Sequence, residues 1–486
     1  MKLSSLICAI DPTLSCPDVE ITTVTDRPAC ANAQSIFVCI HGARANGHAF
    51  APEAYRNGCR VFVAEEPLSL PADAWIVPVS ATRQALAHLA CAFYGHPSRE
   101  MKIIGVTGTK GKTTVSRLLS TLLEKAGIPC GYVGTNGAKY RDVMLPLGNT
   151  TPDPLTLQRI LRQMLDAGIQ AAVLEISSQA LYQFRADGIS FEACVFTNLH
   201  SDHIGPTEHP TFAHYRDAKH RLFTDFAHHV TVVNADDPHT AYMLERTAAE
   251  KVVRYSMCDP TADYYAFHTL PTQSNAGYGI SFRLTPPAES IPVFLPMLGT
   301  FNASNALAAL SVAAECFGID PVLSASLLQT AAVEGRTETL PLKNGACAVI
   351  DYAHNGIGLQ KLLTSLRVYK PRRLICLFGS VGERSQLRRR EMGDVAAKHA
   401  DLAILTSDNP GNEDPASILA DIAQAFSGTK TPYLAIPDRA EAIRTAVEMT
   451  EAGDILVLAG KGHESYQLIG NERVPFSERS ILEEYQ

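Results

Sequence analysis

MKIIGVTGTKGKTTVSRLLSTLLEKAG (Met101–Gly127) is the most informative stretch of this chain. It begins as an apolar run typical of a buried strand, continues as a glycine-rich loop, and ends with apolar residues at helical spacing before Gly127. A strand, glycine loop and helix in this order can wrap backbone N–H groups around a phosphate, with the positive end of the helix at the same place. The stretch therefore predicts a phosphate site in an α/β domain.

Two side chains of the loop have the chemistry that a nucleotide phosphate site needs. Lys112 can reach β- and γ-phosphates, and the Thr113 hydroxyl can bind Mg²⁺. The spacing departs from the strict GxxxxGK[ST] pattern, because Val106 stands where the first glycine would be. The strand before the loop and the helix after it still favour a bound phosphate over an empty glycine turn.

Polar residues near two further predicted strand ends extend this site. Glu175 ends the apolar part of AAVLEIS, and His203 follows the strand EACVFTN. Because the carboxyl ends of parallel strands meet at one edge of a sheet, both are candidate magnesium ligands. Lys219 lies in the predicted helix FAHYRDAKHRLF, where its spacing is that of a solvated face and gives it no role.

The composition limits the classes of protein to consider. With 486 residues, 46% hydrophobic, and a net charge of −8, the chain is long enough for several cores and is a poor candidate for nucleic-acid binding. We find no export signal and no run of eighteen apolar residues, so we expect no membrane span. The twelve cysteines are scattered singly, which favours buried thiols in a reducing cytoplasm over zinc or disulfides.

Strand and helix patterns alternate along the whole chain, and this favours parallel sheets covered by helices. The fold class expected is α/β with three domains. The predicted boundaries are 1–98 for an N-terminal α/β domain, 99–333 for a central phosphate-loop domain, and 334–486 for a C-terminal Rossmann-like domain.

Ten motifs in one order make the chain similar to the Mur ligases over nearly its whole length. They are TGTKGKTT, NTTPDPLTLQ, EISSQAL, FTNLHSDH, HYRDAK, GTFNASNALAA, EGRTE, DYAHNG, SDNPGNEDP and LAGKGHESYQ. The resemblance is strongest to members that add the third amino acid to UDP-N-acetylmuramoyl-L-Ala-D-Glu. It implies a cytoplasmic enzyme of peptidoglycan synthesis, and hence of cell-wall biogenesis, cell shape and cell division.

The resemblance implies an ATP-dependent acid–amino-acid ligase. ATP would phosphorylate the terminal carboxylate of the nucleotide dipeptide, and the amino group of the incoming amino acid would then displace phosphate. A carboxylate becomes electrophilic only when its oxygen is made a good leaving group, and the crowded anionic oxygens then need cations and helix N-termini.

By matching positions, the resemblance assigns catalytic roles to Lys112, Glu175, His203 and Lys219. Two Mg²⁺ sites would use Thr113, Glu175, His203 and Lys219, the last as N6-carboxylysine, which reverses the interpretation from spacing alone. The implied ATP-binding residues are Gly108, Thr109, Lys110, Gly111, Lys112, Thr113, Thr114, Asn302, Arg336 and Asp351. ATP would be enclosed between the central and C-terminal domains.

The other two substrates receive residues in the same way. The implied residues for the UDP-sugar peptide are Val24, Asp26, Ala43, Arg44, Ala45, Thr150, Thr151, Ser177, Gln183 and Arg185. Those for the incoming amino acid are Arg389, Asp408, Asn409, Gly411, Gly460 and Glu464. No protein partner is implied, and a monomer is expected.

Two departures from the family pattern concern substrate recognition. Asp26 stands where the family has a serine, so that an acceptor-only anion replaces a hydroxyl donor. Gly411 stands where members that use meso-diaminopimelate have the arginine of DNPR, which can grip a distal carboxylate. Glycine has no such group, so L-lysine is favoured, with Glu464 or Asp408 as partner for its ammonium. A paralogue that adds another amino acid to a related acceptor remains the alternative.

Rival classes fit the sequence less well. A folylpolyglutamate or cyanophycin synthetase lacks the uridine-nucleotide section that the N-terminal residues resemble. The intact set of Lys112, Glu175, His203 and Lys219 disfavours a non-catalytic nucleotide sensor. No guanine-reading NKxD follows the loop, which disfavours a GTPase.

Overall fold

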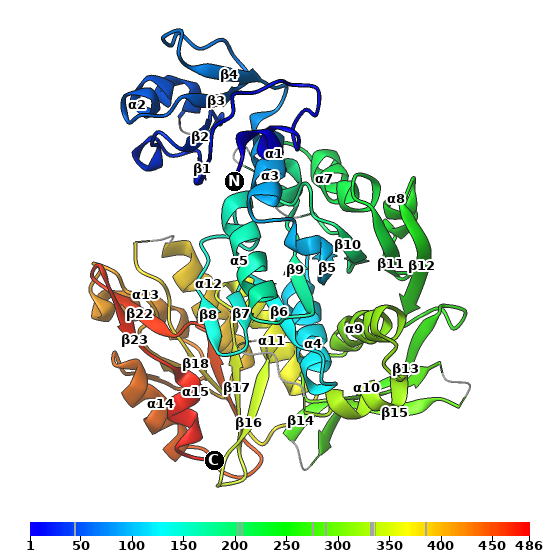
Figure 1. The fold of residues 1–486 in the computed structure, drawn as a ribbon. Helices are drawn as coiled ribbons and strands as arrows, with labels where there is room; N and C mark the ends of the chain where they lie inside the picture. The colour runs from blue at the N-terminus through cyan, green and yellow to red at the C-terminus, as the bar shows by residue number, and fades with distance from the viewer. Residues whose placement is uncertain are drawn as a thin grey trace. The chain divides into compact units, whose positions relative to one another are not determined.

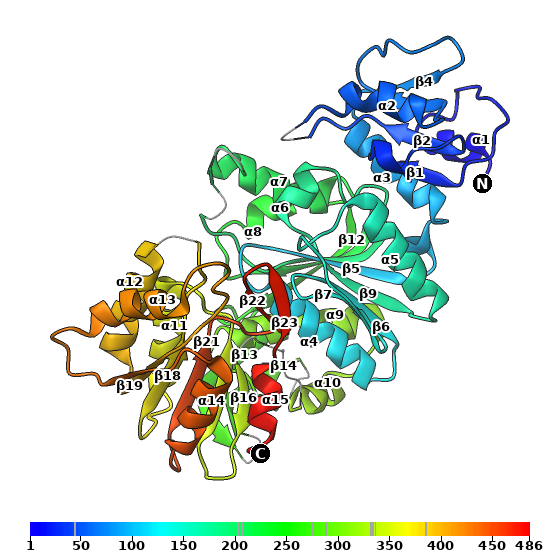
Figure 2. The ribbon, with the colours of Figure 1, turned by 90° about the vertical axis from the view of Figure 1, so that its left-hand side faces the viewer.

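The computed structural model describes residues 1–42, 45–201, 204–205, 208–274, 277–286, 289–330, 335, 337–383 and 386–486. The chain forms two compact units, one of Met1–Asp263 with Ala308–Ile319 and one of Tyr264–Leu307 with Asp320–Gln486. Figures 1 and 2 show helices and strands alternating in both. In the described part of the chain, no helix is long and apolar enough to cross a membrane.

The first unit begins with a small parallel sheet covered on both faces. Its strands, in order, are β1 (Thr23–Thr25), β2 (Ser35–Val38), β3 (Val61–Ala64) and β4 (Trp75–Pro78). Ile36 and Val38 face the core that contains α1 (Leu3–Ile7) and α3 (Thr82–Phe93). Phe37 faces the opposite core with α2 (Ala51–Arg56), as the two-residue period of a strand requires.

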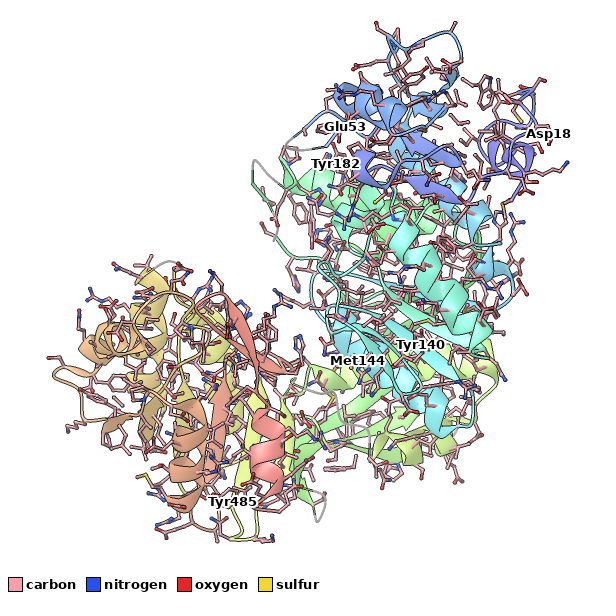
Figure 3. All side chains as sticks on the ribbon, turned by 60° about the vertical axis from the view of Figure 1, so that its left-hand side comes forward. Asp18, Glu53, Tyr140, Met144, Tyr182 and Tyr485 are labelled. Carbon is pink, nitrogen blue, oxygen red and sulfur yellow. The ribbon has the colours of Figure 1, made fainter. Side chains whose placement is uncertain are left out.

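The larger sheet of the first unit carries the phosphate loop. Its strands, in order, are β12 (Ala249–Ser256), β11 (His228–Asn234), β10 (Phe191–Phe196), β5 (Lys102–Thr107), β9 (Ala171–Glu175), β6 (Cys130–Gly134), β7 (Gly137–Tyr140) and β8 (Val143–Leu145). The strands from β12 to β6 are parallel, and β7 and β8 add an antiparallel edge. Figure 3 labels Tyr140 and Met144 on this edge, the first buried and the second half exposed.

The helices that accompany this sheet are α4 (Lys112–Lys125), α5 (Pro154–Asp166), α6 (Ser178–Tyr182), α7 (Phe212–Thr224) and α8 (Thr240–Leu244). The start of α5 shows how the sequence sets such an element. Asp153 caps the helix by accepting a bond from the Thr156 N–H at 3.0 Å, and Pro154 occupies the first turn, where its missing N–H costs nothing. Leu157, Ile160 and Leu161 then recur on one face and pack into the core.

The second unit contains an antiparallel group of strands, β13 (Tyr264–Ser274), β14 (Gly277–Thr285) and β15 (Ile291–Leu295). Helix α10 (Pro321–Leu328) also belongs to this unit, and the chain passes from the second unit to the first within α9 (Asn302–Phe317). The antiparallel group was not predicted, because alternating strand and helix patterns along the chain favoured parallel sheets. The alternation of apolar and polar residues from Tyr278 to Thr285 is the sequence signal that could have found it.

The C-terminal part of the second unit is a second α/β sheet. Its strands, in order, are β16 (Glu338–Pro341), β17 (Cys347–Asp351), β21 (Ile455–Ala459), β18 (Leu374–Phe378), β19 (Leu402–Leu405) and β20 (Tyr433–Ala435). One face packs on α11 (Gly356–Arg367), α12 (Gln386–His399) and α13 (Pro415–Ala423), and the other on α14 (Arg439–Glu448) and α15 (Glu478–Glu483), as Figure 2 shows. The hairpin of β22 (Tyr466–Ile469) and β23 (Glu472–Pro475) follows β21.

These sheets confirm the predicted α/β class. From β17 to β20 the C-terminal sheet is parallel, and β16 is an antiparallel edge. The predicted domain boundaries at 98/99 and 333/334 stay predictions.

Candidate functional site

The phosphate loop joins β5 to α4 and needs glycine at two positions. Gly108 has φ +148°, and a Cβ there would collide with the Thr197 hydroxyl oxygen. Gly111 has φ +86° and precedes the first residue of α4. The backbone can therefore turn sharply into the helix, whose positive N-terminal end lies at the loop and favours an anion there.

Lys112 lies over the loop that it is predicted to serve. Its Nζ donates to the carbonyl oxygen of Gly108 at 2.9 Å and to that of Thr109 at 3.2 Å. These bonds hold the ammonium beside the loop, where it can neutralise phosphate oxygens.

Two of the predicted magnesium ligands lie side by side. Thr113 Oγ1 donates to Glu175 Oε2 at 2.9 Å, and the Glu175 side chain is only 1% exposed. The same carboxylate accepts bonds from the Thr135 N–H at 3.0 Å and the Thr135 hydroxyl at 3.2 Å. Hydroxyl and carboxylate oxygens are the ligands that Mg²⁺ prefers, so these residues fit the predicted ion.

Lys219 lies beside the phosphate loop. It is 1% exposed on α7, and its Nζ donates to the carbonyl oxygen of Gly108 at 2.8 Å. Its ammonium also lies 4.7 Å from the ring centre of Tyr215, whose hydroxyl is 3.0 Å from Thr109 Oγ1. Spacing alone suggested a solvated position for Lys219, and that interpretation is wrong, because α7 turns this face of the helix towards the loop. Carboxylation of Lys219 stays a prediction.

The other predicted ATP and magnesium residues lie outside the phosphate loop in the sequence. Arg336 and the magnesium candidate His203 lie outside the described residues. Asn302 and Asp351 belong to the second unit. Asn302 is buried and donates to the Leu298 carbonyl oxygen at 2.8 Å, and the Asp351 carboxylate accepts from the Thr337 N–H at 2.8 Å.

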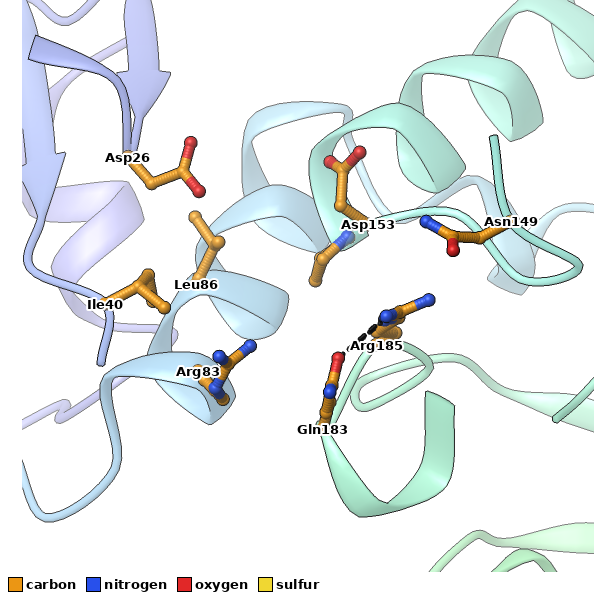
Figure 4. A pocket seen from close by; sticks show the side chains of 9 residues that line it. Asp26, Ile40, Arg83, Leu86, Asn149, Asp153, Gln183 and Arg185 are labelled. Carbon is orange, nitrogen blue, oxygen red and sulfur yellow. Dashed lines mark hydrogen bonds between the residues drawn. The ribbon is translucent and has the colours of Figure 1, made fainter. Parts of the chain in front are cut away.

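A cavity of about 140 Å³ in the first unit collects residues predicted for the nucleotide sugar (Figure 4). Its lining residues are Asp26, Ile40, Arg83, Leu86, Asn149, Asp153, Pro154, Gln183 and Arg185. Asp26 lies in the loop after β1, and its desolvation by the surrounding protein raises the pKa of this carboxyl. A raised pKa means that this carboxyl takes up a proton at a higher pH than an ordinary aspartate does.

Hydrogen bonds connect this cavity to Glu175. Arg185 donates to the Thr151 carbonyl oxygen at 2.8 Å, and the Thr151 hydroxyl donates to the Glu175 carbonyl oxygen at 2.7 Å. The Ser177 N–H donates to the Thr151 hydroxyl at 3.1 Å, and Ser177 also caps α6. Residues that the resemblance assigns to the acceptor thus adjoin the magnesium candidate.

Three of the remaining residues predicted to bind the nucleotide sugar, Val24, Ala45 and Thr150, are described. The Thr150 hydroxyl is 3.2 Å from that of Thr135, which bonds to Glu175. Val24 is buried in β1, and Ala45 is exposed, with its carbonyl oxygen accepting from the Gly42 N–H at 2.9 Å. Ala43 and Arg44 lie outside the described residues.

Except for Arg389, the residues predicted to bind the incoming amino acid follow β19 and β21 at their carboxyl ends. Glu464 and Asn409 share a hydrogen bond at 2.9 Å, and both bond to Lys461, which is fully buried. Asp408 lies 3.8 Å from the same ammonium, and burial raises the pKa of its carboxyl. Gly460 has φ +116°, and a Cβ there would lie 2.6 Å from Asp408 Oδ2. Lys461 therefore already supplies a cation to the two acids.

Gly411 lies where two loops meet. It has φ +59°, and a Cβ there would lie 2.8 Å from Glu383 Oε2, in the loop after β18. The Gly411 N–H donates to the Leu468 carbonyl oxygen at 3.0 Å, which ties the loop to β22. Any side chain at this position must therefore adopt a left-handed backbone and displace Glu383.

Arg389 occupies a buried position in α12. Its side chain is 1% exposed and pairs with Glu413 at 2.6 Å and Asp421 at 2.8 Å. Both carboxylates belong to the chain itself, so in this conformation the guanidinium ties α12 to α13 and to the loop before it. Its predicted contact with the incoming amino acid stays a prediction.

Several residues around these sites were missed by the sequence reasoning. Arg83, Asn149 and Asp153 line the cavity, and Tyr132 and Thr135 bond to Glu175. Lys461 follows the strand ILVLA after one glycine, and that strand-end position could have identified it. Tyr132 lies inside a strand, and no local signal marks it.

Comparisons with known proteins identify the family of this chain. The Mur ligase middle domain matches residues 106–313, the Mur ligase glutamate ligase domain residues 335–462, and the Mur ligase family catalytic domain residues 31–94. A protein of Chlorobaculum tepidum is 40% identical over 476 residues, covering 95% of this chain and 92% of its own length. It is named UDP-N-acetylmuramoyl-L-alanyl-D-glutamate--2,6-diaminopimelate ligase.

The chain belongs to the Mur ligase family. A relative with the same name from Geobacillus kaustophilus is 38% identical over 473 residues, covering 96% of this chain and 94% of its own. A solved structure described as a ligase of that name has 32% identity and a TM-score of 0.74, with 100% of this chain and 99% of that chain covered. The predictions of Mur ligase membership and of the ATP-dependent ligase class are confirmed.

Proposed function

We propose that this Mur ligase adds the third amino acid to UDP-N-acetylmuramoyl-L-Ala-D-Glu in peptidoglycan synthesis. The observation that carries the proposal is the phosphate loop with Lys112, Thr113, Glu175 and Lys219 gathered around it, in a chain whose relatives bear that name. The cavity lined by Asp26 and Arg185 is the proposed site of the nucleotide sugar.

The proposed chemistry has two steps. A carboxylate oxygen of the acceptor attacks the γ-phosphorus of ATP, ADP leaves, and an acyl phosphate forms. The amino group of the incoming amino acid then attacks the acyl carbon, phosphate leaves with the bonding pair, and the nitrogen loses a proton. Lys112 and the positive N-terminal end of α4 neutralise the phosphate oxygens during both steps.

Magnesium is the proposed metal, and Thr113 and Glu175 are the described residues that would hold it. When bound, it would supply positive charge to the transferring phosphoryl group. His203 and a carboxylated Lys219 are proposed for a second ion.

We infer that the incoming amino acid is 2,6-diaminopimelate, because relatives up to 40% identical are named for that substrate. The fully buried Lys461 supports this preference over L-lysine. It bonds to Glu464 at 2.9 Å and lies 3.8 Å from Asp408, so the two acids proposed for a lysine ammonium already have a cation.

L-Lysine is the second candidate, and Gly411 is the observation that favours it. No side chain extends from this position, and the nearest group is the Glu383 carboxylate. A carboxylate there repels the distal carboxylate of diaminopimelate and attracts an ammonium.

A substrate panel tests the proposal. Phosphate release is measured with UDP-N-acetylmuramoyl-L-Ala-D-Glu plus meso-diaminopimelate, L-lysine, L-ornithine or no amino acid. The proposal predicts release that depends on both the nucleotide and an amino acid, with the highest kcat/KM for diaminopimelate. A preference for lysine would favour the second candidate, and activity with none of them would favour a paralogue with another substrate.

A further inference from the structure

A tyrosine outside the matched motifs binds the carboxylate at the centre of the proposed magnesium site. Tyr132 is 1% exposed in β6, which pairs with β9 in parallel so that Tyr132 lies opposite Val173. Its hydroxyl hydrogen-bonds to Glu175 Oε1, two residues further along β9. The two residues are 43 positions apart in the chain, so the pairing of β6 with β9 is what brings them together.

The carboxylate can only accept, so the Tyr132 hydroxyl is the donor, and a neighbour occupies the acceptor side of the same oxygen. The Asn136 N–H donates to the Tyr132 hydroxyl oxygen at 3.3 Å. The hydroxyl proton is therefore directed to Glu175. The contact also constrains Gly134, because a Cβ there would collide with both the tyrosine oxygen and Glu175 Oε1.

The two oxygens of Glu175 have different surroundings. Oε1 is held by the Tyr132 hydroxyl and by the Thr135 N–H at 3.0 Å. Oε2 accepts from the Thr113 hydroxyl at 2.9 Å, on the side of the phosphate loop, and from the Thr135 hydroxyl at 3.2 Å. Rotation about the last side-chain bond of a glutamate is soft, so the contacts on Oε1 hold the plane of the carboxylate with its other oxygen towards Thr113.

We propose that Tyr132 is a positioning residue that orients Glu175 towards the magnesium ion. This inference rests on the proposed magnesium site. Groups that hydrogen-bond to a metal ligand fix its orientation, and their loss typically weakens metal binding by about 10- to 100-fold.

The test is Tyr132→Phe in the full chain, which removes only the hydroxyl. Binding of Mn²⁺, a paramagnetic probe for the magnesium site, is measured by electron paramagnetic resonance at saturating ADP. The apparent Kd is expected to rise about tenfold. In phosphate release the Mg²⁺ requirement rises by a similar factor, while kcat at saturating Mg²⁺ recovers.

Two further variants make the result specific. Tyr140→Phe changes another buried tyrosine of the same sheet and is expected to leave Mn²⁺ binding unchanged. Gly134→Ala forces Tyr132 and Glu175 apart and is expected to weaken binding in the same direction as Tyr132→Phe. Unchanged Mn²⁺ affinity in folded Tyr132→Phe would overturn the inference. Failure of the wild-type chain to bind Mn²⁺ would instead overturn the magnesium site itself.

Discussion

Two loops of this molecule have a similar construction. One is the phosphate loop of the first unit, and the other is the loop after β19 in the second unit, where the incoming amino acid is proposed to bind (the amino-acid loop). Both follow a buried parallel strand, and both contain a glycine with positive φ, +86° at Gly111 and +59° at Gly411. They differ in the groups proposed to bind the ligand. Backbone N–H groups and one lysine suffice for a phosphate, whereas the second loop combines side chains from the ends of β18, β19 and β21.

The difference explains why the reaction class is easier to infer than the substrate. A phosphate loop is defined by a short contiguous stretch, so its chemistry survives changes elsewhere. The amino-acid loop depends on residues such as Glu383, Asn409 and Lys461, which the fold brings together. One substitution there changes the charge that a substrate meets without changing the fold.

The largest expected loss of activity comes from a substitution at Glu175, beside the phosphate loop. Glu175→Gln keeps the shape of the side chain but removes the charge that faces Thr113. We expect kcat to fall by about 10²- to 10³-fold, as for loss of one preorganised electrostatic group. Phosphate release at saturating substrates measures it.

Glu192→Gln is the matched control, because Glu192 lies in β10 of the same sheet and pairs with Lys102 at 2.7 Å. If both variants lost activity equally, or neither did, Glu175 would have no special role.

A second substitution tests whether Arg389 stabilises the fold or contacts the incoming amino acid. Arg389→Met leaves Glu413 and Asp421 without their buried partner, and we expect the free energy of unfolding to fall by about 1 to 3 kcal/mol, because both carboxylates are partly exposed and water can hydrate them. Denaturant unfolding measures this loss.

Arg390→Met serves as control, because the neighbouring Arg390 is 78% exposed and its nearest carboxylate oxygen, on Asp394, is 4.0 Å away. Unchanged stability with a raised KM for the amino acid would show instead that Arg389 contacts the substrate, as the family resemblance implies.

The third change sharpens the question of substrate choice. Gly411→Arg introduces a guanidinium beside Glu383 and should raise kcat/KM for diaminopimelate relative to lysine by about tenfold, the value of one charge-assisted hydrogen bond. Gly411→Ala carries the same backbone strain without the charge, and its ratio should stay at the wild-type value. Equal shifts in both variants would mean that strain, and not charge, determines the preference.

The smallest expected effect is in the nucleotide-sugar cavity. Desolvation raises the pKa of Asp26, so the carboxyl becomes neutral on acidification at a higher pH than usual. A neutral carboxyl donates and does not repel an anionic ligand, so the affinity for UDP should rise as the pH falls from neutral towards the ordinary pKa of an aspartate. Calorimetry measures the affinity. Asp26→Ser should reduce the pH dependence, whereas Asp18→Ser, at an exposed position, should leave it intact.

Contiguous signals allowed much of the fold to be predicted from sequence. The strand, loop and helix around Lys112 and the strand ending at Glu175 could be recognised from local apolar patterns. Contacts between distant residues could not, because they depend on strand register and helix rotation. Tyr132 reaches Glu175 through the pairing of β6 with β9, and Lys219 reaches Gly108 through the rotation of α7. Lys461 meets Asn409 across two neighbouring loops, which leaves no trace in either motif.

Transfer of an oxygen atom tests the central claim most directly. UDP-N-acetylmuramoyl-L-Ala-D-Glu labelled with ¹⁸O in its carboxylates is incubated with the enzyme, ATP, Mg²⁺ and diaminopimelate, and the released phosphate is examined by mass spectrometry. Formation of an acyl phosphate predicts one ¹⁸O atom in each phosphate, in step with formation of the nucleotide tripeptide. Unlabelled phosphate, released whether or not the amino acid is present, would contradict it.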